Sequence, residues 1–360
     1  MTPATATLLN TETMPRKAII TKITPSQDLA NRRAVASWLY LCCGAVGFMI
    51  IIGGITRLTE SGLSMIEWRP LVGMVPPLSV GEWERIFGLY RATSEFRLEN
   101  PYITLNAFKS IFWWEYIHRL WGRIIGVLYA VGFIWLLLRG CINKSLLPHL
   151  VNLFILGGAQ AVVGWWMVQS GFVDRTDVSQ YRLVIHLGIA FLILGYMLWL
   201  SLNLIERKKA EQISANTTRL AFAMLGVVCV TVLSGGLTAG LDAGLIYNTW
   251  PLIDGRIVPS GLFAETPIWL NFLENKMTVQ FDHRFMAYVT IGIVFTLWWK
   301  IHRVPHVTHA IHILLAVVIA QAMLGISTLV LIVPLPLAIA HQMSAIALFL
   351  TAVWTTHALR

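Results

Sequence analysis

The sequence WWEYIHRLWGRIIGVLYAVGFIWLLL, residues 113–138, decides the fold class of this protein. Its second part, from residue 124 onward, is an uncharged apolar run that belongs in the interior of a bilayer. Its first part brings Glu115, His118 and two arginines to the edge of that run. Ionisable groups inside a membrane are costly and are usually functional. The stretch therefore predicts a membrane helix that carries a site.

The composition of the whole chain favours an integral membrane protein. Of its 360 residues, 56% are hydrophobic and only 12% are charged, and the 15 tryptophans suit interfacial belts. The formal net charge of +9 could indicate nucleic-acid binding. However, the basic residues gather in short segments between apolar runs, which is the positive-inside pattern of membrane proteins. We therefore predict a lipid bilayer environment and no nucleic-acid partner.

Apolar runs of spanning length predict eight transmembrane helices. They lie at about 36–56, 117–138, 149–170, 183–204, 219–239, 285–301, 308–332 and 337–357. An even number of spans places both termini on one side. The N-terminal tail and the loops on that side are rich in lysine and arginine, as at Arg207, Lys208 and Lys209. The sequence thus predicts an all-α integral membrane protein with both termini cytoplasmic.

The two halves of the chain resemble each other in four segments that occur in the same order. These are GGITRLTESGL (53–63) with GGLTAGLDAGL (235–245), EYIHRLWGRIIG (115–126) with QFDHRFMAYVTIG (280–292), GAQAVVGWW (158–166) with IAQAMLGIS (319–327), and LVIHLGIAFLIL (183–194) with LAIAHQMSAIALFL (337–350). This parallel repeat predicts two pseudo-symmetric four-helix bundles.

The repeat also predicts how the chain is divided. We expect a cytoplasmic N-terminal tail at 1–35, a first bundle at 36–205, a cytoplasmic linker at 206–218 and a second bundle at 219–360. The first bundle includes a long outer loop at 58–112. Within this loop, Ser79 and Glu82 form a capping-box pattern ahead of apolar residues at helical spacing. We expect an amphipathic helix on the outer surface there.

Four histidines occupy equivalent positions in the repeat. His118, His186, His283 and His341 lie near the outer ends of the second, fourth, sixth and eighth predicted spans. A lone histidine in an apolar helix is most often a hydrogen-bonded structural residue. Two repeated pairs at one depth instead favour iron ligands in bundle interiors. We predict two porphyrin sites, one in each half.

Residues that flank these histidines have two possible roles. Arg119 and Arg284 follow a histidine directly and could pair with haem propionates or reach the membrane interface. Several glycines could give room to a flat macrocycle or allow ordinary close packing of helices. They are Gly53, Gly54, Gly158, Gly164, Gly235, Gly236 and Gly325.

One position separates the two halves chemically. Glu115 stands three residues before His118, whereas Gln280 stands three residues before His283. This spacing places each pair on one helix face. A carboxylate can transfer protons or stabilise a developing cation, but an amide cannot titrate. We predict that the first half reacts and the second transfers electrons. The alternative is that Glu115 pairs with an arginine at the interface.

The sequence resembles the haem A synthase family, in its proteobacterial and mitochondrial form. The resemblance covers nearly the whole chain from about residue 36. It rests on GGITRLTESGLSMIEWRPLVGMVPPLS, EYIHRLWGR, GLDAGLIYNTWPLIDG and FDHRFMAY, together with His186 and His341. Cysteine pairs found in the outer loops of a related bacterial branch are missing from this sequence, so no thiol step is expected.

The resemblance implies roles for the predicted site residues. His283 and His341, with Arg284 and Gln280 beside them, would hold a permanent haem b. His118 and His186, with Arg119, would bind the substrate haem O, and Glu115 would be the essential acidic residue. The reaction would oxidise a methyl group of haem O to a formyl group through successive hydroxylation and dehydration.

The resemblance also implies a location and partners. The protein would lie in the bacterial inner membrane, with its haem sites near the periplasmic side. A haem O-producing farnesyltransferase would supply the substrate, cytochrome oxidase would receive haem A, and an unidentified redox partner would exchange electrons.

Two other functions fit some of these features. A dihaem b-type electron carrier, such as a quinol oxidoreductase subunit, would also use four histidines. It would not need Glu115 in one half only, and it would place its haems at different depths. A transporter built from parallel repeats would require broken midplane helices, which the sequence does not predict.

Overall fold

The structure, a computed structural model, describes residues 24–67, 72–172, 176–205, 213–305 and 307–360. Within these ranges the regular secondary structure is entirely helical. Eight of the helices are long and apolar enough to cross a bilayer. The prediction of an all-α integral membrane protein with eight spans is confirmed.

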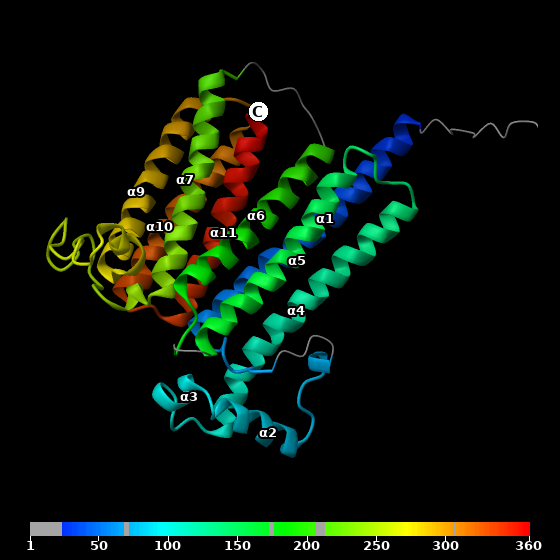
Figure 1. The fold of residues 1–360 in the computed structure, drawn as a ribbon. Helices are drawn as coiled ribbons and strands as arrows, with labels where there is room; N and C mark the ends of the chain where they lie inside the picture. The colour runs from blue at the N-terminus through cyan, green and yellow to red at the C-terminus, as the bar shows by residue number, and fades with distance from the viewer. Residues whose placement is uncertain (1–23, 68–71, 173–175, 206–212, 306) are drawn as a thin grey trace, which may run out of the picture.

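The eight long helices divide equally between the two halves of the chain (Figure 1). Those of the first half are α1 (Pro25–Leu58), α4 (Leu105–Leu138), α5 (Leu147–Gln169) and α6 (Gln180–Ile205). Those of the second half are α7 (Ala215–Gly240), α9 (Lys276–Ile301), α10 (Thr308–Val330) and α11 (Leu335–Ala358). The connections contain the short helices α2 (Val80–Tyr90), α3 (Ser94–Leu98) and α8 (Asn271–Glu274), and four 3₁₀ turns.

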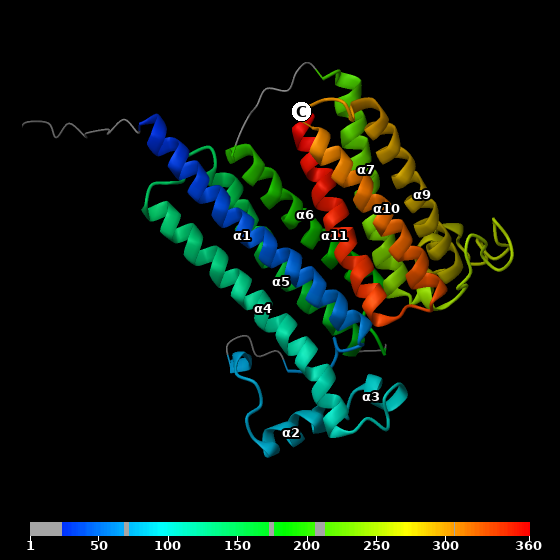
Figure 2. The ribbon, with the colours of Figure 1, turned by 180° about the vertical axis from the view of Figure 1, so that it is seen from behind.

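Each half uses the same pattern of neighbouring helices. In the first half, α1 and α5 each contact both α4 and α6. In the second half, α7 and α10 each contact both α9 and α11. Consequently α4 and α6 face each other diagonally, and so do α9 and α11. The halves meet along α1, α6, α7 and α11, as the front and back views show (Figures 1 and 2).

Several helices extend beyond the apolar runs that predict them. α1 begins at Pro25, inside the segment expected to be a tail, and α4 begins at Leu105. The N-cap residues explain this, because the hydroxyls of Thr24 and Thr104 accept hydrogen bonds from Gln27 and Ala107. Part of the expected linker, residues 206–212, lies outside the described residues, and α7 begins at Ala215. α1 and α4 therefore extend beyond their apolar runs, and hydropathy does not predict these polar extensions.

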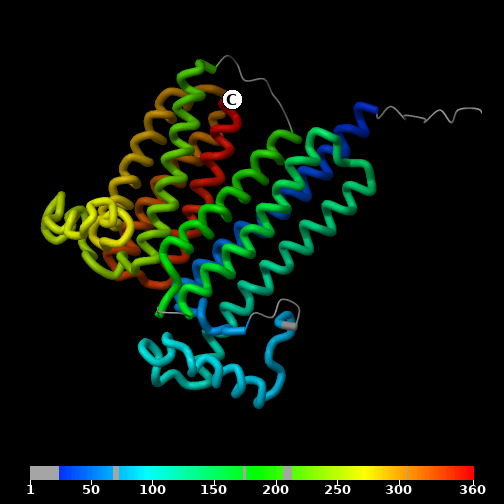
Figure 3. Tube along the Cα trace, in the orientation of Figure 1, coloured from blue at the N-terminus to red at the C-terminus, as the bar shows by residue number. Residues whose placement is uncertain are grey.

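The loop between α1 and α4 forms a folded cap, which we define as the described residues between 59 and 104. It lies at the end of the bundle opposite the C-terminus (Figures 1 and 3). Its helix α2 is capped by Ser79, as the sequence predicts. The ring centroids of Trp83 and Phe112 are 5.0 Å apart, as are those of Tyr90 and Phe108. The apolar face of α2 therefore packs on the extension of α4 and holds the cap on the first half.

Polar contacts join the two halves at the same end of the bundle. Arg57 on α1 forms a 2.9 Å ion pair with Asp242. The Gln342 amide donates to the Ile50 carbonyl at 2.5 Å. Gly54 lies beside it, and a Cβ there would be 1.5 Å from Gln342 Oε1, so a larger residue would displace this amide. α1 therefore contacts the residue that follows His341 in the second half.

Candidate functional site

The four histidines form two pairs, each inside one half. His118 on α4 and His186 on α6 lie within electrostatic range of each other, as do His283 on α9 and His341 on α11. Because these helices are diagonal neighbours, each pair of imidazoles faces across the interior of its half. The structure thus brings together the pairs that the sequence predicts. This is the arrangement in which two helices can ligate one haem iron from opposite sides.

Each imidazole lies against a glycine on an adjacent helix. A Cβ at Gly164, Gly235 or Gly325 would approach the Cε1 atom of His186, His283 or His341 to 2.8, 3.0 or 2.8 Å. A Cβ at Gly53 would lie 3.3 Å from His118 Nε2. Any larger residue would force the ring to move.

The remaining glycines named from the sequence have other roles. Gly54 and Gly236 lie at the junction of the halves, against Gln342 and against Val184 and Leu187. Nothing lies within 4 Å of a Cβ built at Gly158. Only some of these glycines therefore belong to the histidine sites.

Two glutamines complete the pairs, although their role is not apparent from the sequence. Gln160 Nε2 lies 3.4 Å from His186 Nε2, and Gln321 Nε2 lies 3.5 Å from His341 Nε2. The repeat places Gln160 and Gln321 at equivalent positions. The alignment of the two halves could have identified both glutamines as candidate members of the histidine sites.

The residues present fit a haem in each half. The Nδ1 atoms of His186 and His341 and the amide oxygens of Gln160 and Gln321 are buried without a hydrogen-bond partner in the described structure. The glycine on the adjacent helix provides the space that each ring occupies. The same part of the chain contains no group of three or more His, Cys, Asp or Glu that could hold a metal ion. Paired imidazoles in an apolar interior suit porphyrin iron, which needs two axial ligands.

Glu115 lies inside the protein, not at the lipid interface. The residue is only 2% exposed. One carboxylate oxygen accepts hydrogen bonds from the Ser64 hydroxyl and the Met65 amide, both at 2.7 Å. The other oxygen forms an ion pair with Arg119. Pairing with Arg119, which the sequence left as an alternative, therefore occurs, but it occurs in a buried site and not at the interface.

Gln280 repeats this geometry without the charge. It is also 2% exposed, and its amide donates to the carbonyls of Ala243 and Ile246, both at 2.6 Å. Its oxygen accepts from Arg284 at 2.7 Å. Arg284 also donates to the Tyr247 carbonyl at 2.8 Å. Both halves thus hold a loop against the histidine helix, and only the first uses an ionisable group.

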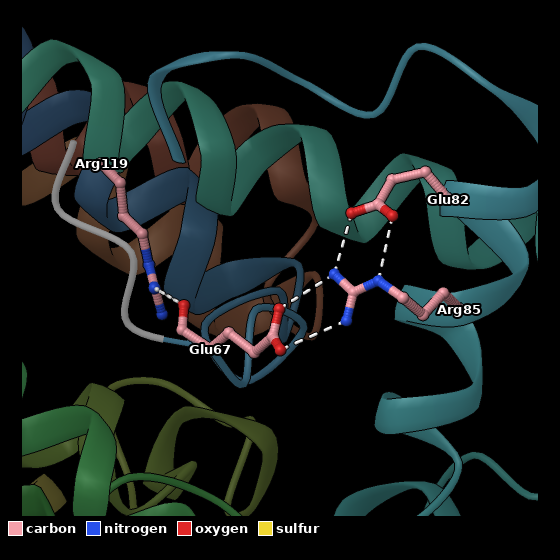
Figure 4. A network of polar contacts seen from close by, with 4 residues as sticks. All are labelled: Glu67, Glu82, Arg85 and Arg119. Carbon is pink, nitrogen blue, oxygen red and sulfur yellow. Dashed lines mark hydrogen bonds and ion pairs between the residues drawn. The ribbon is translucent and has the colours of Figure 1, made fainter. Parts of the chain in front are cut away.

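Arg119 connects the site to the cap (Figure 4). Its guanidinium donates to the carbonyls of Met65 at 2.8 Å and Glu67 at 3.4 Å. The Glu67 carboxylate binds Arg85 on α2 at 3.0 Å, and Glu82 binds the same arginine at 2.8 Å. This network fixes the segment that donates to Glu115. The predicted contact between Arg119 and a propionate remains a prediction.

A cavity of about 360 Å³ lies beside this network, between the cap and α4. Apolar side chains such as Ile86, Phe112 and Tyr116 line it, together with Arg119 and Arg123. The cavity is therefore amphipathic, with arginines of both α4 and α2 and the carboxylates of Glu67 and Glu82 in its lining.

A second buried carboxyl lies near Glu115 and has no clear signal in the sequence. Glu95 begins the short helix α3 and is 4% exposed. Its Oε2 atom has no hydrogen-bond partner among the described residues, and its carboxyl interacts with the Tyr90 hydroxyl. Burial, and then the nearby charge of Glu115, raises the pKa of Glu95 to about 8. Its surroundings in sequence, ATSEFRLEN, look like an ordinary polar loop.

We expect Glu95→Gln to stabilise the protein selectively at alkaline pH. The folded protein holds the Glu95 proton up to about pH 8, whereas an unfolded chain releases it near 4.5. Stability should therefore fall as pH rises through this interval, by on the order of 1 kcal/mol per pH unit. Removing the carboxylate removes that loss.

Thermal unfolding in detergent at pH 5 and at pH 8.5 tests this expectation. The gain in Tm for Glu95→Gln over the wild type should be larger at pH 8.5. The exposed neighbour Glu99→Gln should show little change with pH. An equal shift at both pH values for Glu95→Gln would contradict the expectation.

Comparison with known proteins gives a consistent result. Residues 36–353 match the COX15-CtaA family, described as cytochrome oxidase assembly protein. The protein named heme A synthase from Rhodospirillum centenum is 46% identical over 340 residues, which cover 93% of this chain and 91% of the relative. The heme A synthase of Parvibaculum lavamentivorans is 44% identical, covering 92% and 95% of the two chains. That of Nitrosospira multiformis is 43% identical, covering 98% and 99%. Together with two histidine pairs inside eight apolar helices, these matches establish that the chain belongs to the COX15-CtaA family of cytochrome oxidase assembly proteins.

Proposed function

We propose that this protein is a haem A synthase, which oxidises a methyl group of haem O to a formyl group. The observation that carries this proposal is the contrast between two similar sites. Each has two histidines and adjacent glycines, but a buried carboxylate, Glu115, occurs in one site where the other has Gln280. A protein that only relays electrons through two haems has no need of this difference.

The first half is the substrate site in this proposal. His118 and His186 bind haem O from opposite sides, with Gly53 and Gly164 giving room beside the rings. Arg119, which lines the cavity described above, lies on the same helix as His118 and one turn after Glu115. A membrane-embedded site also suits haem O, whose farnesyl chain is strongly apolar.

The second half is the site of a resident haem b. His283 and His341 would hold it, and Arg284 and Gln280 hold the adjacent loop. When bound, haem b would supply one-electron transfer. Gln342, next to His341, contacts α1 at the junction of the halves, so the two sites share a packed boundary.

Glu115 moves protons at the substrate site. With water as the oxygen source, each of the two hydroxylations of the methyl group would release two protons and, to the redox partner, two electrons. Loss of water from the resulting diol then requires proton transfer between oxygen atoms. The carboxylate is held by Ser64, Met65 and Arg119, so its orientation is fixed before the substrate binds. Positioned general acids and bases of this type accelerate reactions by about 10²- to 10⁴-fold.

The proposed setting follows from this activity. The protein lies in the bacterial inner membrane, with its haem sites toward the periplasmic side. A haem O synthase supplies the substrate, haem A passes to cytochrome oxidase, and a separate redox partner accepts electrons. The clustering of basic residues in the tail and in the loops at the opposite end supports this orientation.

Expression of the full chain in cells that make haem O tests the proposed function. Extracted porphyrins are separated by chromatography and identified by mass. We expect haem A, with hydroxylated haem O as a minor species, and neither product in cells that carry an empty vector. Haem O alone in both cultures, with the protein present in the membrane, would reject the proposal.

A further inference from the structure

The two histidine sites differ at a polar position beside the imidazole. Ser234 on α7 directly precedes Gly235, the glycine that contacts His283. The repeat aligns Ser234 with Ile52 on α1, which directly precedes Gly53. Ile52 is buried and apolar. The second site therefore has a hydroxyl where the first has an aliphatic side chain.

The Ser234 hydroxyl lies between two polar partners. Its Oγ is 2.8 Å from the carbonyl oxygen of Thr231 and 2.9 Å from His283 Nδ1. A histidine that presents its Nε2 lone pair to iron carries its hydrogen on Nδ1. In that tautomer, Ser234 Oγ accepts from Nδ1 and donates to Thr231.

The other three histidines are held differently. The Nδ1 atoms of His186 and His341 are buried with no partner in the described parts of the chain. No hydrogen bond to His118 occurs within those parts either. Among the four imidazoles as described, His283 is the one whose Nδ1 lies within hydrogen-bond distance of a side-chain hydroxyl.

We propose that Ser234 is a positioning residue that fixes the tautomer of His283 and so makes the second site the one that retains its haem. This inference rests on the proposed function, in which the second half keeps haem b while the first exchanges substrate for product. Partners of the second imidazole nitrogen orient the ligand and raise its basicity, and their loss typically costs about 10- to 100-fold in affinity. At the first site, Ile52 offers no such bond, which suits a haem that must leave.

Ser234→Val and Ser234→Thr form a matched pair for the test. Valine and threonine have the same shape, but threonine retains the hydroxyl. The full-length proteins are purified in detergent, and the transfer of bound haem b to excess apomyoglobin is followed by absorbance. We expect Ser234→Val to lose haem about 10- to 100-fold faster than the wild type, and Ser234→Thr to remain close to it.

The reduction potential of bound haem b gives a second readout. A purely structural role of Ser234 would not produce the change in potential that loss of a hydrogen bond at Nδ1 predicts. A hydrogen bond from Nδ1 makes the imidazole a stronger donor to ferric iron. Its loss in Ser234→Val should raise the midpoint potential of haem b, and Ser234→Thr should restore it.

The outcomes separate this inference from the proposed function. Equal haem loss and equal potentials in Ser234→Val and Ser234→Thr would overturn the inference, because the hydroxyl would then have no effect. A wild-type protein that purifies without haem b would overturn the proposed function, and this inference with it.

Discussion

Glu115→Gln is expected to abolish formation of haem A while the protein still folds and keeps haem b. The variant removes the group that accepts and donates protons, so the rate should fall by about 10²- to 10⁴-fold. The second half indicates that an amide is tolerated here, because Gln280 occupies the equivalent buried position beside Arg284. The amide has one acceptor oxygen fewer than the carboxylate, so a loss of about 1–3 kcal/mol in stability is also expected.

Porphyrin analysis of membranes that contain equal amounts of each protein measures this effect. The control is Gln280→Glu, which places a carboxylate beside Arg284 in the other half. Combining it with Glu115→Gln should not restore haem A, because the proposed substrate site lies in the first half. Product formation by Glu115→Gln at the wild-type rate would show that Glu115 only holds the cap.

The second large effect concerns the histidine pairs, which should fail in different ways. His341→Ala removes one axial ligand of the second site, so the purified protein should lose its haem b spectrum. His186→Ala removes the equivalent ligand of the first site. It should keep the haem b spectrum but form no haem A, because the substrate is no longer held from both sides.

Absorbance spectra of the purified variants, with haem extraction from the same samples, distinguish the two sites. His302→Ala at the turn between α9 and α10 is the control, since this histidine stacks on Trp298 and contacts neither pair. Loss of haem b in His186→Ala together with its retention in His341→Ala would reverse the assignment of the two halves.

The fold could be predicted from the sequence because hydropathy marks the spans and the internal repeat relates the two halves. Eight apolar runs and two histidines per half sufficed to predict the spans and the pairing of His118 with His186. The ends of the helices could not be predicted as well. The extension of α4 back to Leu105 depends on the Thr104 cap and on aromatic packing against α2, which hydropathy does not register.

The site was predictable in its ligands but not in its supports. Glu115 stands out because its counterpart is Gln280. Ser64 and Met65, which hold the carboxylate, lie in the cap, far from it in sequence. Glu95 could not be identified, since its burial results from the way the cap folds over α4 and leaves no pattern in the local sequence.

The adjacent glycines of α1 have a consequence for how the duplicated unit can be used. Gly53 faces His118 in the first half, while Gly54 faces Gln342, the residue after His341 in the second. Neighbouring residues of one helix therefore pack on both halves. The second half, expressed without α1, would lose the contact at Gln342, whereas the first half would keep its own α1 and the glycine beside His118. The two halves are thus not equivalent as separate folding units.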